Sequence, residues 1–147
     1  MIAVIQRCSR GKVMVSEKVV GEIDNGLVIL LGVQKGDTEK DADFLVNKIS
    51  GLRIFSDEND KMNLSIKDVN GSALVISQFT LCGDTKKGRR PSFVNAALPD
   101  DGNRLYEYFM SEMQKGGVPI ESGEFGAMMD VELVNDGPVT FVLNSKD

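Results

Sequence analysis

Hydrophobic and polar residues follow two spacings along this chain. Residues 2–8 alternate loosely, as in a strand, and residues 11–15 are expected to continue a paired strand. The run 27–33 is unbroken and apolar, which predicts a strand covered on both faces. Asp24-Asn25-Gly26 stands just before that run, so we expect a hairpin turn there.

Helical spacing replaces alternation in two segments. Thr38 and Asp41 resemble a capping box at the start of a helix predicted over residues 39–51. Its apolar stripe comprises Ala42, Leu45, Val46, Ile49 and Leu52. A second helix is predicted over residues 100–115, ending at Gly116-Gly117. Its apolar face comprises Leu105, Tyr108, Phe109 and Met113.

The remaining apolar segments read as short strands. We expect them at residues 53–56, 73–81, 118–122, 125–134 and 138–144, with a turn at 57–60. No repeat, linker or low-complexity tract interrupts the chain. The prediction is therefore one α+β domain over residues 1–147, with a small curved sheet or β-barrel-like core and two flanking helices.

Composition narrows the chemistry that this domain can perform. The chain has 147 residues, no histidine, two cysteines and a net charge of −5. The charge argues against broad nucleic-acid binding, and the missing His and few Cys argue against a zinc site or disulfide framework. No apolar run approaches the ~20 residues that a membrane span needs, and the first residues lack a signal-peptide layout. We therefore expect a cytoplasmic protein without a zinc site made of its own side chains.

Two polar motifs follow strand-like runs. Ser77-Gln78-Phe79-Thr80-Leu81 comes after the run 73–76, and Gly137-Pro138 lies between the runs 131–134 and 139–143. Without histidine, chemistry must use hydroxyls, backbone dipoles, carboxylates or the substrate. A Gly-Pro bond is one of the few places where a cis peptide costs little free energy relative to trans, and glycine lets the backbone approach a ligand closely. Taken singly, each motif is also ordinary strand-end or turn chemistry.

A basic loop and a cysteine adjoin the first motif. Lys86, Lys87, Arg89 and Arg90 are candidates for phosphate binding, or else form a solvated loop. Cys82 is a candidate thiolate nucleophile, but a buried thiol is the favoured interpretation because no His could activate it.

The chain resembles the D-aminoacyl-tRNA deacylases over essentially its whole length. The resemblance rests on six ordered segments: residues 1–7, 53–57 and 61–64, Ser77–Leu81, Gly88-Arg89-Arg90-Pro91-Ser92-Phe93, and Asn135-Asp136-Gly137-Pro138-Val139-Thr140. The resemblance to the family is weaker only on the surface around residues 114–124. The resemblance implies a β-barrel-like fold, a homodimer and no cofactor. It also implies hydrolysis of the ester between a D-amino acid, or mischarged glycine, and the 3′-terminal ribose of tRNA.

The resemblance also implies roles for particular residues. The Gly137-Pro138 bond is expected to be cis, to enter the partner's site and to reject L-residues, with Arg7 bracing its loop. The Phe79 and Thr80 N–H groups stabilise developing negative charge, and the ribose 2′-hydroxyl helps to activate water. Ser77 and Gln78 complete the catalytic motif, with Gln78 orienting the terminal nucleotide. Phe125 and Met129 line its pocket or belong to the core, and the basic loop contacts the acceptor end.

Three other interpretations remain open. One is the paralogous enzyme that edits L-alanyl-tRNA for threonine, in which the Gly-Pro bond is trans. Another is a non-catalytic RNA- or DNA-associated binding module that uses the basic loop. The third is an esterase with Thr80 as a covalent nucleophile.

Overall fold

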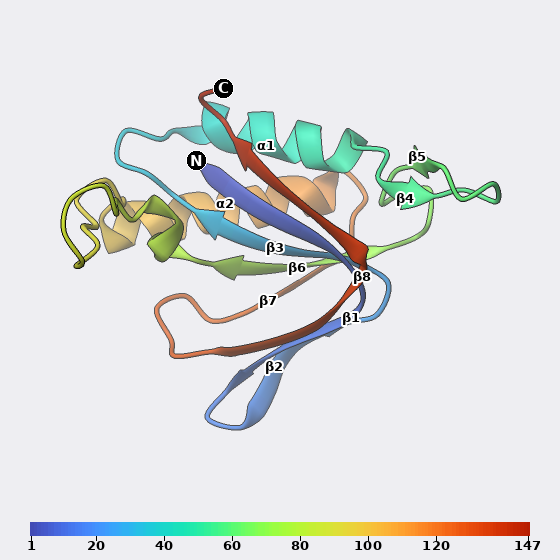
Figure 1. Ribbon diagram of the computed structural model, residues 1–147, viewed down its shortest axis with the longest axis horizontal. Helices are drawn as coiled ribbons and strands as arrows, with labels where there is room; N and C mark the ends of the chain where they lie inside the picture. The colour runs from blue at the N-terminus through green and yellow to red at the C-terminus, as the bar shows by residue number, and fades with distance from the viewer.

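The computed structural model describes residues 1–147 as a strongly curved sheet with two long helices on one face (Figure 1). The strands of this sheet are β1 (Ile2–Val15), β2 (Lys18–Ile23), β3 (Gly26–Gly32), β6 (Ser72–Ser77), β7 (Ile120–Ser122) and β8 (Asp130–Asn144). The helices are α1 (Glu39–Gly51) and α2 (Pro99–Lys115). A short hairpin of β4 (Phe55–Ser56) and β5 (Met62–Leu64) lies beside the sheet. The α+β prediction with a barrel-like core and two helices is confirmed.

The long strand β1 organises the sheet. One edge of β1 pairs with β8 along almost its whole length, from Ile2 opposite Asn144 to Met14 opposite Asp130. Its other edge pairs first with β3 and then, from Gly11 onward, with β2. The sheet order is β2-β1-β3-β6-β7, and the Glu22 N–H of β2 donates to Glu121 Oε1 of β7 at 3.4 Å. The two ends of the sheet therefore approach one another and nearly close a barrel.

The two faces of β3 bury different partners. Leu27, Ile29 and Leu31 belong to the larger core beneath the helices, while Val28 belongs to a smaller cluster within the curved sheet. The predicted two-sided burial of this strand is confirmed. Burial on both faces fixes the register of β3. If the strand slipped by one residue, its side chains would exchange faces and lose their packing partners.

Helix α1 has the predicted bounds because its capping signal is satisfied. Thr38 Oγ1 accepts from the Lys40 N–H at 3.3 Å, and Asp41 Oδ2 accepts from the Thr38 N–H at 2.9 Å. Helix α2 begins at Pro99, one residue before the predicted start, since proline is favoured at the first helical position. Both apolar helix faces pack on the larger core.

The hairpin prediction was wrong in position. Asp24-Asn25-Gly26 connects β2 to β3, which both pair with β1 and not with each other. The tight hairpin joins β1 to β2 instead, through Ser16 and Glu17 at φ 50° and 66°. Both residues adopt the left-handed conformation that a two-residue hairpin loop requires. A sequence signal for a turn does not say which strands it will pair.

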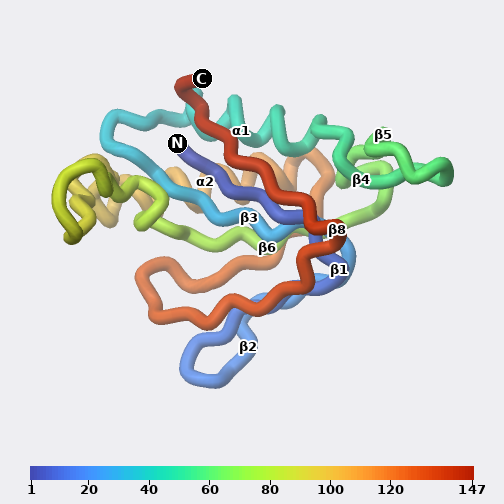
Figure 2. Tube along the Cα trace, in the orientation of Figure 1, coloured from blue at the N-terminus to red at the C-terminus, as the bar shows by residue number.

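Strand predictions near the C-terminus were also partly wrong. The two pieces at 125–134 and 138–144 form one bent strand, β8, which starts only at Asp130. Between Gln6 and Cys8, four residues of β8 stand opposite the single residue Arg7, which produces the bend visible in the Cα trace (Figure 2). Segments 53–56 and 118–122 shorten to β4 and β7.

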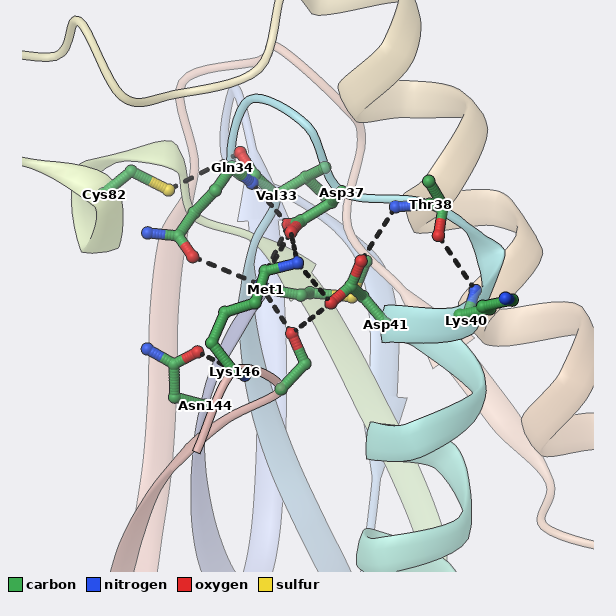
Figure 3. Close-up of polar contacts among 11 residues, drawn as sticks. Met1, Val33, Gln34, Asp37, Thr38, Lys40, Asp41, Cys82, Asn144 and Lys146 are labelled. Carbon is green, nitrogen blue, oxygen red and sulfur yellow. Dashed lines mark hydrogen bonds and ion pairs between the residues drawn. The ribbon is translucent and has the colours of Figure 1, made fainter.

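Both chain ends meet beside the start of α1 (Figures 1 and 2). The Met1 ammonium bonds Asp37 Oδ1 at 3.0 Å, Ser145 Oγ at 2.9 Å and Gln34 Oε1 at 3.2 Å. Asp41 Oδ1 accepts from Ser145 Oγ at 2.7 Å and lies 2.9 Å from Lys146 Nζ. We call this group the terminal clasp; it consists of the Met1 ammonium and the side chains of Gln34, Asp37, Asp41, Ser145 and Lys146 (Figure 3).

Candidate active site

A cavity of about 680 Å³ opens where β6 ends. Its walls come from three segments: the end of β6 with the turn that follows, the start of α2 with the residues before it, and the connection from β7 into β8. The lining residues are Ile76, Ser77, Gln78, Phe79, Thr80, Ala96, Ala97, Pro99, Phe125, Gly126, Ala127, Met128, Met129 and Val131. The cavity therefore brings together six residues that the sequence singled out, four from the first motif and two from the later segment.

The first wall is a short 3-10 helix and not the strand that we predicted. Strand β6 ends at Ser77, and residues Phe79–Cys82 form the helix. The Gln78 N–H donates to Leu31 O of β3 at 2.8 Å, after which the chain turns. Phe79 and Thr80 thus occupy the first turn of a helix, whose N–H groups have no acceptor within the helix. Neither N–H donates in any hydrogen bond outside the regular elements.

The side chains of this wall are held by local contacts. Gln78 Nε2 donates to Thr80 Oγ1 at 2.5 Å. Phe79 is 57% exposed, and its ring meets Phe93 edge to face with centroids 5.0 Å apart. Cys82 is buried, and its Sγ donates to Val33 O at 3.5 Å. Burial raises the pKa of the Cys82 thiol, which favours the interpretation of a packed thiol over a thiolate nucleophile.

The opposite wall contains Phe125 and Met129. The Phe125 ring lies 6.0 Å from the Tyr106 ring of α2, and the Tyr106 hydroxyl donates to Val75 O of β6 at 2.9 Å. Phe125 therefore packs against α2, through a tyrosine that is itself bonded to β6, and it also lines the cavity. The sequence left open whether these residues line the cavity or belong to the core. Phe125 lines the cavity, whereas Met129 lines it and also packs against the smaller core cluster.

Sequence reasoning missed several lining residues. Ala96, Ala97 and Pro99 precede or start α2, and Met128 is 92% exposed on the loop before β8. None carries a polar group that a motif search would notice. Only the pairing of distant segments brings these residues to the cavity.

The second motif lies elsewhere in the chain. Gly137-Pro138, whose peptide bond is cis, is absent from the cavity lining, and so is Arg7. The bend in β8 lies at the opposite side of the sheet from the end of β6 (Figure 1). One copy of the chain therefore does not bring the two motifs together.

Arg7 is buried and holds the second motif. It is only 8% exposed; its Nη1 donates to Ile54 O at 2.8 Å and its Nε to Asp136 O at 3.0 Å. Asn135 spans the bend, since its Oδ1 accepts from the Val139 N–H at 2.9 Å. Gly137 has φ +138°, and a Cβ there would lie 2.7 Å from Val139 Cγ2 and 3.2 Å from Arg7 Nη2. A side chain at position 137 would therefore force a neighbouring atom to shift, in a backbone conformation that L-residues rarely adopt.

The basic loop is exposed and closed at its base. Asp84 and Ser92 exchange two backbone hydrogen bonds, of 2.7 and 2.9 Å. The four cations Lys86, Lys87, Arg89 and Arg90 are all exposed between them, and none forms an ion pair within the chain. The loop follows the 3-10 helix directly, so its positive charge lies near one wall of the cavity.

Metal and membrane sites can be described briefly. No three His, Cys, Asp or Glu side chains gather in a way that could hold a metal ion. Neither helix combines the length and the apolar character required to cross a bilayer.

Comparison with known proteins identifies one family and relatives that match this chain over most of its length. The family described as D-Tyr-tRNA(Tyr) deacylase matches residues 4–144. A D-aminoacyl-tRNA deacylase of Thermotoga petrophila is 57% identical over 145 residues, covering 99% of this chain and 97% of the relative. One from Bacillus cytotoxicus is 56% identical over 146 residues, covering 99% of this chain and all of the relative, 100%.

Solved structures share the fold of this chain. One described as c-Myc DNA Unwinding Element Binding Protein has a TM-score of 0.93 and 38% identity, covering 98% of both chains. Another, described as a probable eukaryotic D-amino acid tRNA deacylase, has a TM-score of 0.82 and 18% identity, over 97% of this chain and 98% of that one; it supports the fold alone. On the strength of the full-length sequence match, the chain belongs to the D-Tyr-tRNA(Tyr) deacylase family.

Proposed function

We propose that this protein hydrolyses the ester that joins a D-amino acid to the 3′-terminal ribose of tRNA. The observation that carries the proposal is the identity of 57% to an enzyme named D-aminoacyl-tRNA deacylase, over 99% of the chain. The cavity at the end of β6 supports it, because polar backbone and hydroxyl groups meet an apolar wall there. Such a site suits an aminoacyl group attached to a nucleoside.

Backbone N–H groups supply the electrostatic part of the mechanism. Phe79 and Thr80 stand in the first turn of the 3-10 helix, where the ester carbonyl oxygen can accept from their N–H groups as it becomes negative. Each such donor typically contributes ~10²–10³ in rate. Because the chain has no histidine, the 2′-hydroxyl of the terminal ribose assists the attacking water. The Thr80 hydroxyl is not the nucleophile in this proposal.

Gly137-Pro138 acts as the chiral filter of a second subunit in a homodimer. Arg7 and Asn135 hold this segment from within the sheet, on the side away from the cavity. Its main-chain oxygens accept from the substrate ammonium and crowd the direction in which an L-side chain would point. A D-residue avoids the clash and glycine has no side chain to clash, so glycyl-tRNA mischarged for alanine is also a substrate.

The deciding experiment compares three esters on the same enzyme preparation. D-Tyr-tRNA and Gly-tRNA should be hydrolysed far faster than L-Tyr-tRNA. Preferred hydrolysis of L-alanyl-tRNA for threonine would favour the paralogous editing enzyme. A D-Tyr-tRNA ending in 2′-deoxyadenosine should react poorly; normal cleavage of it together with an inactive Thr80→Ala enzyme would restore the covalent-nucleophile mechanism.

Subunit exchange tests whether the site is shared. Phe79→Pro removes one proposed N–H donor at the first helical position, where proline is tolerated, and Gly137→Ala places a Cβ where Val139 Cγ2 lies 2.7 Å away. Each variant alone should be nearly inactive. A mixed dimer would have one site with both defects and one with neither, so mixing should restore activity. No recovery despite proven exchange would place the filter within a single subunit.

The basic loop is proposed to contact phosphates near the acceptor end. Replacing Lys86 and Lys87 by Ala should raise KM with little change in kcat, since phosphate contacts position the tRNA. The dependence of KM on salt should also become weaker. Unchanged KM and salt dependence would identify the loop as solvated surface.

Nucleic-acid binding without catalysis is the second candidate function. The relevant observation is the name of the solved structure at 38% identity, which describes a DNA-element binding protein. In this alternative the exposed cations of the loop bind DNA, although the chain carries a net charge of −5. Tight DNA binding together with no deacylation of any of the three esters would favour it.

A further inference from the structure

Gly32, at the end of β3, lies behind the wall of the cavity that carries the first motif. It is buried and faces the 3-10 helix Phe79–Cys82. A Cβ placed on Gly32 would lie 3.0 Å from Leu81 Cβ, 3.1 Å from Gln78 O and 3.3 Å from Cys82 Sγ. All three nearest atoms belong to this one turn. The missing side chain therefore lets the turn lie directly on β3.

Hydrogen bonds on both sides of Gly32 hold the turn at this close approach. Leu31 O accepts from the Gln78 N–H at 2.8 Å, just before the turn. Val33 O accepts from Cys82 Sγ at 3.5 Å, at the end of the turn (Figure 3). The Phe79 and Thr80 N–H groups lie between these two anchors. Their position relative to the cavity is set by how closely the turn approaches β3.

The continuation of β3 also holds the second wall. Val33 O accepts from the Ala97 N–H at 3.0 Å as well as from Cys82. Lys35 N–H donates to Asn95 O at 2.9 Å, next to an isolated bridge between Gln34 and Ala96. One carbonyl thus bonds two walls of the cavity. The segment from Gly32 to Lys35 is a common support for both.

We propose that Gly32 is a positioning residue for ester hydrolysis, because it fixes the distance between the Phe79–Thr80 donors and the opposite walls. This inference rests on the proposed function. Gly32 does not line the cavity. A side chain at this position pushes the turn into the cavity by a few tenths of an ångström. This displacement weakens transition-state contacts more than substrate binding, since misplacement of about 1 Å can lower the rate ~10²-fold.

The test compares two crowded buried glycines. A Cβ on Gly71 would meet Ile66 Cγ1, Gly26 Cα and Asn25 O at 3.0, 3.2 and 3.3 Å, nearly the crowding at Gly32, but away from the cavity. Gly32→Ala should lower kcat for D-Tyr-tRNA by roughly 10- to 100-fold with KM within about threefold. Gly71→Ala should leave kcat within about twofold at a similar loss of stability. Equal kcat losses in the two variants, or none at Gly32, would overturn the proposal.

A second pair of variants covers the case in which Gly32→Ala does not fold. Cys82→Ala removes the anchor to Val33 O, and Cys8→Ala removes the other buried thiol, whose Sγ donates to Asp24 O at 3.6 Å. Only Cys82→Ala should lower kcat, by several-fold. An unchanged kcat in Cys82→Ala would count against the proposal.

Amide NMR separates this inference from the proposed function. The Phe79 and Thr80 amide resonances should shift in Gly32→Ala and stay unchanged in Gly71→Ala. Absence of deacylation by the unmodified protein would refute the proposed function, yet the amide shifts would still decide whether Gly32 positions the turn. Unshifted Phe79 and Thr80 resonances in a folded Gly32→Ala variant would refute the positional claim itself.

Discussion

The terminal clasp and the cavity are two polar regions with opposite character. In the clasp, charged groups from three distant segments are bonded to one another, and Asp37 and the Met1 ammonium are fully buried (Figure 3). In the cavity, the polar groups are mostly backbone and hydroxyl, and much of the lining is apolar. The charged groups of the clasp are therefore paired with one another inside the protein. The candidate active site, in contrast, contains the Phe79 and Thr80 N–H groups, which have no acceptor within the 3-10 helix.

This difference follows from what burial does to polar groups. A buried charge is tolerated only when it is paired, so the clasp is saturated by its own members. A catalytic donor must lack an internal partner, because a satisfied N–H has nothing to offer a developing oxyanion. We expect substitutions in the clasp to change stability and substitutions in the cavity to change rate.

The largest expected effect is at Asp37. Asp37→Ala leaves the buried Met1 ammonium without its carboxylate, and breaking a buried pair in this way typically costs about 3–5 kcal/mol. Urea unfolding should show this loss of stability. The change in kcat per folded molecule, expressed as an activation free energy, should be much smaller. Asp100→Ala, an exposed aspartate at the start of α2, should cost under about 1 kcal/mol. Equal losses in the two variants would contradict the structural role of the clasp.

Phe79→Pro should produce the reverse pattern. Removing one N–H donor should lower kcat by ~10²–10³ relative to Phe79→Ala, which removes the same ring but keeps the donor. Since Phe79 is largely exposed at the first helical position, the free energy of unfolding should differ by less than about 1 kcal/mol between the two. Equal kcat values would assign the role to the ring and not to the backbone.

Acid should weaken the clasp through Asp41. Burial by itself raises the pKa of Asp41, but hydrogen bonds from Lys146, the Thr38 N–H and Ser145 outweigh it and lower this pKa to about 2. The stabilisation is therefore complete above the unfolded pKa of ~3.9 and is lost as pH falls from about 4 to 2. We expect the free energy of unfolding to fall by on the order of 1–2 kcal/mol over this range. The loss is no larger because Lys146 is half exposed and solvent screens its charge.

Unfolding titrations at several pH values would measure this effect. The same series on Asp41→Asn should show a smaller loss of stability between pH 4 and 2. Parallel curves for the two proteins would mean that other carboxylates cause the acid sensitivity.

The smallest effect is expected at Thr80. Thr80→Ala removes only an exposed hydrogen bond from Gln78 Nε2, so unfolding free energy should change by less than about 0.5 kcal/mol. Activity should remain substantial, because the backbone N–H of residue 80 is unchanged. A steady-state deacylation assay of Thr80→Ala and Phe79→Pro side by side measures the difference in kcat. Loss of activity as large as in Phe79→Pro would show that the hydroxyl itself is required.

Local sequence determined the elements whose signals are complete within a few residues. Thr38 and Asp41 cap α1 reciprocally, and its apolar stripe predicted both ends of the helix. The unbroken run in β3 predicted burial on two faces, and the ordered motifs identified the family. These features depend on backbone groups and side chains that are neighbours along the chain, so their physical cause is visible in the sequence.

Tertiary structure decided what depends on pairing between distant segments. The turn at Asp24-Asn25-Gly26 did not become a hairpin, because both strands that it connects pair with β1. The strand predicted to end at Leu81 stops at Ser77, where Gln78 bonds β3 and the chain turns. The clasp joins Met1 to residues 36 and 144 positions away along the chain. No local pattern encodes such contacts, since they form only when the whole sheet has closed around its core.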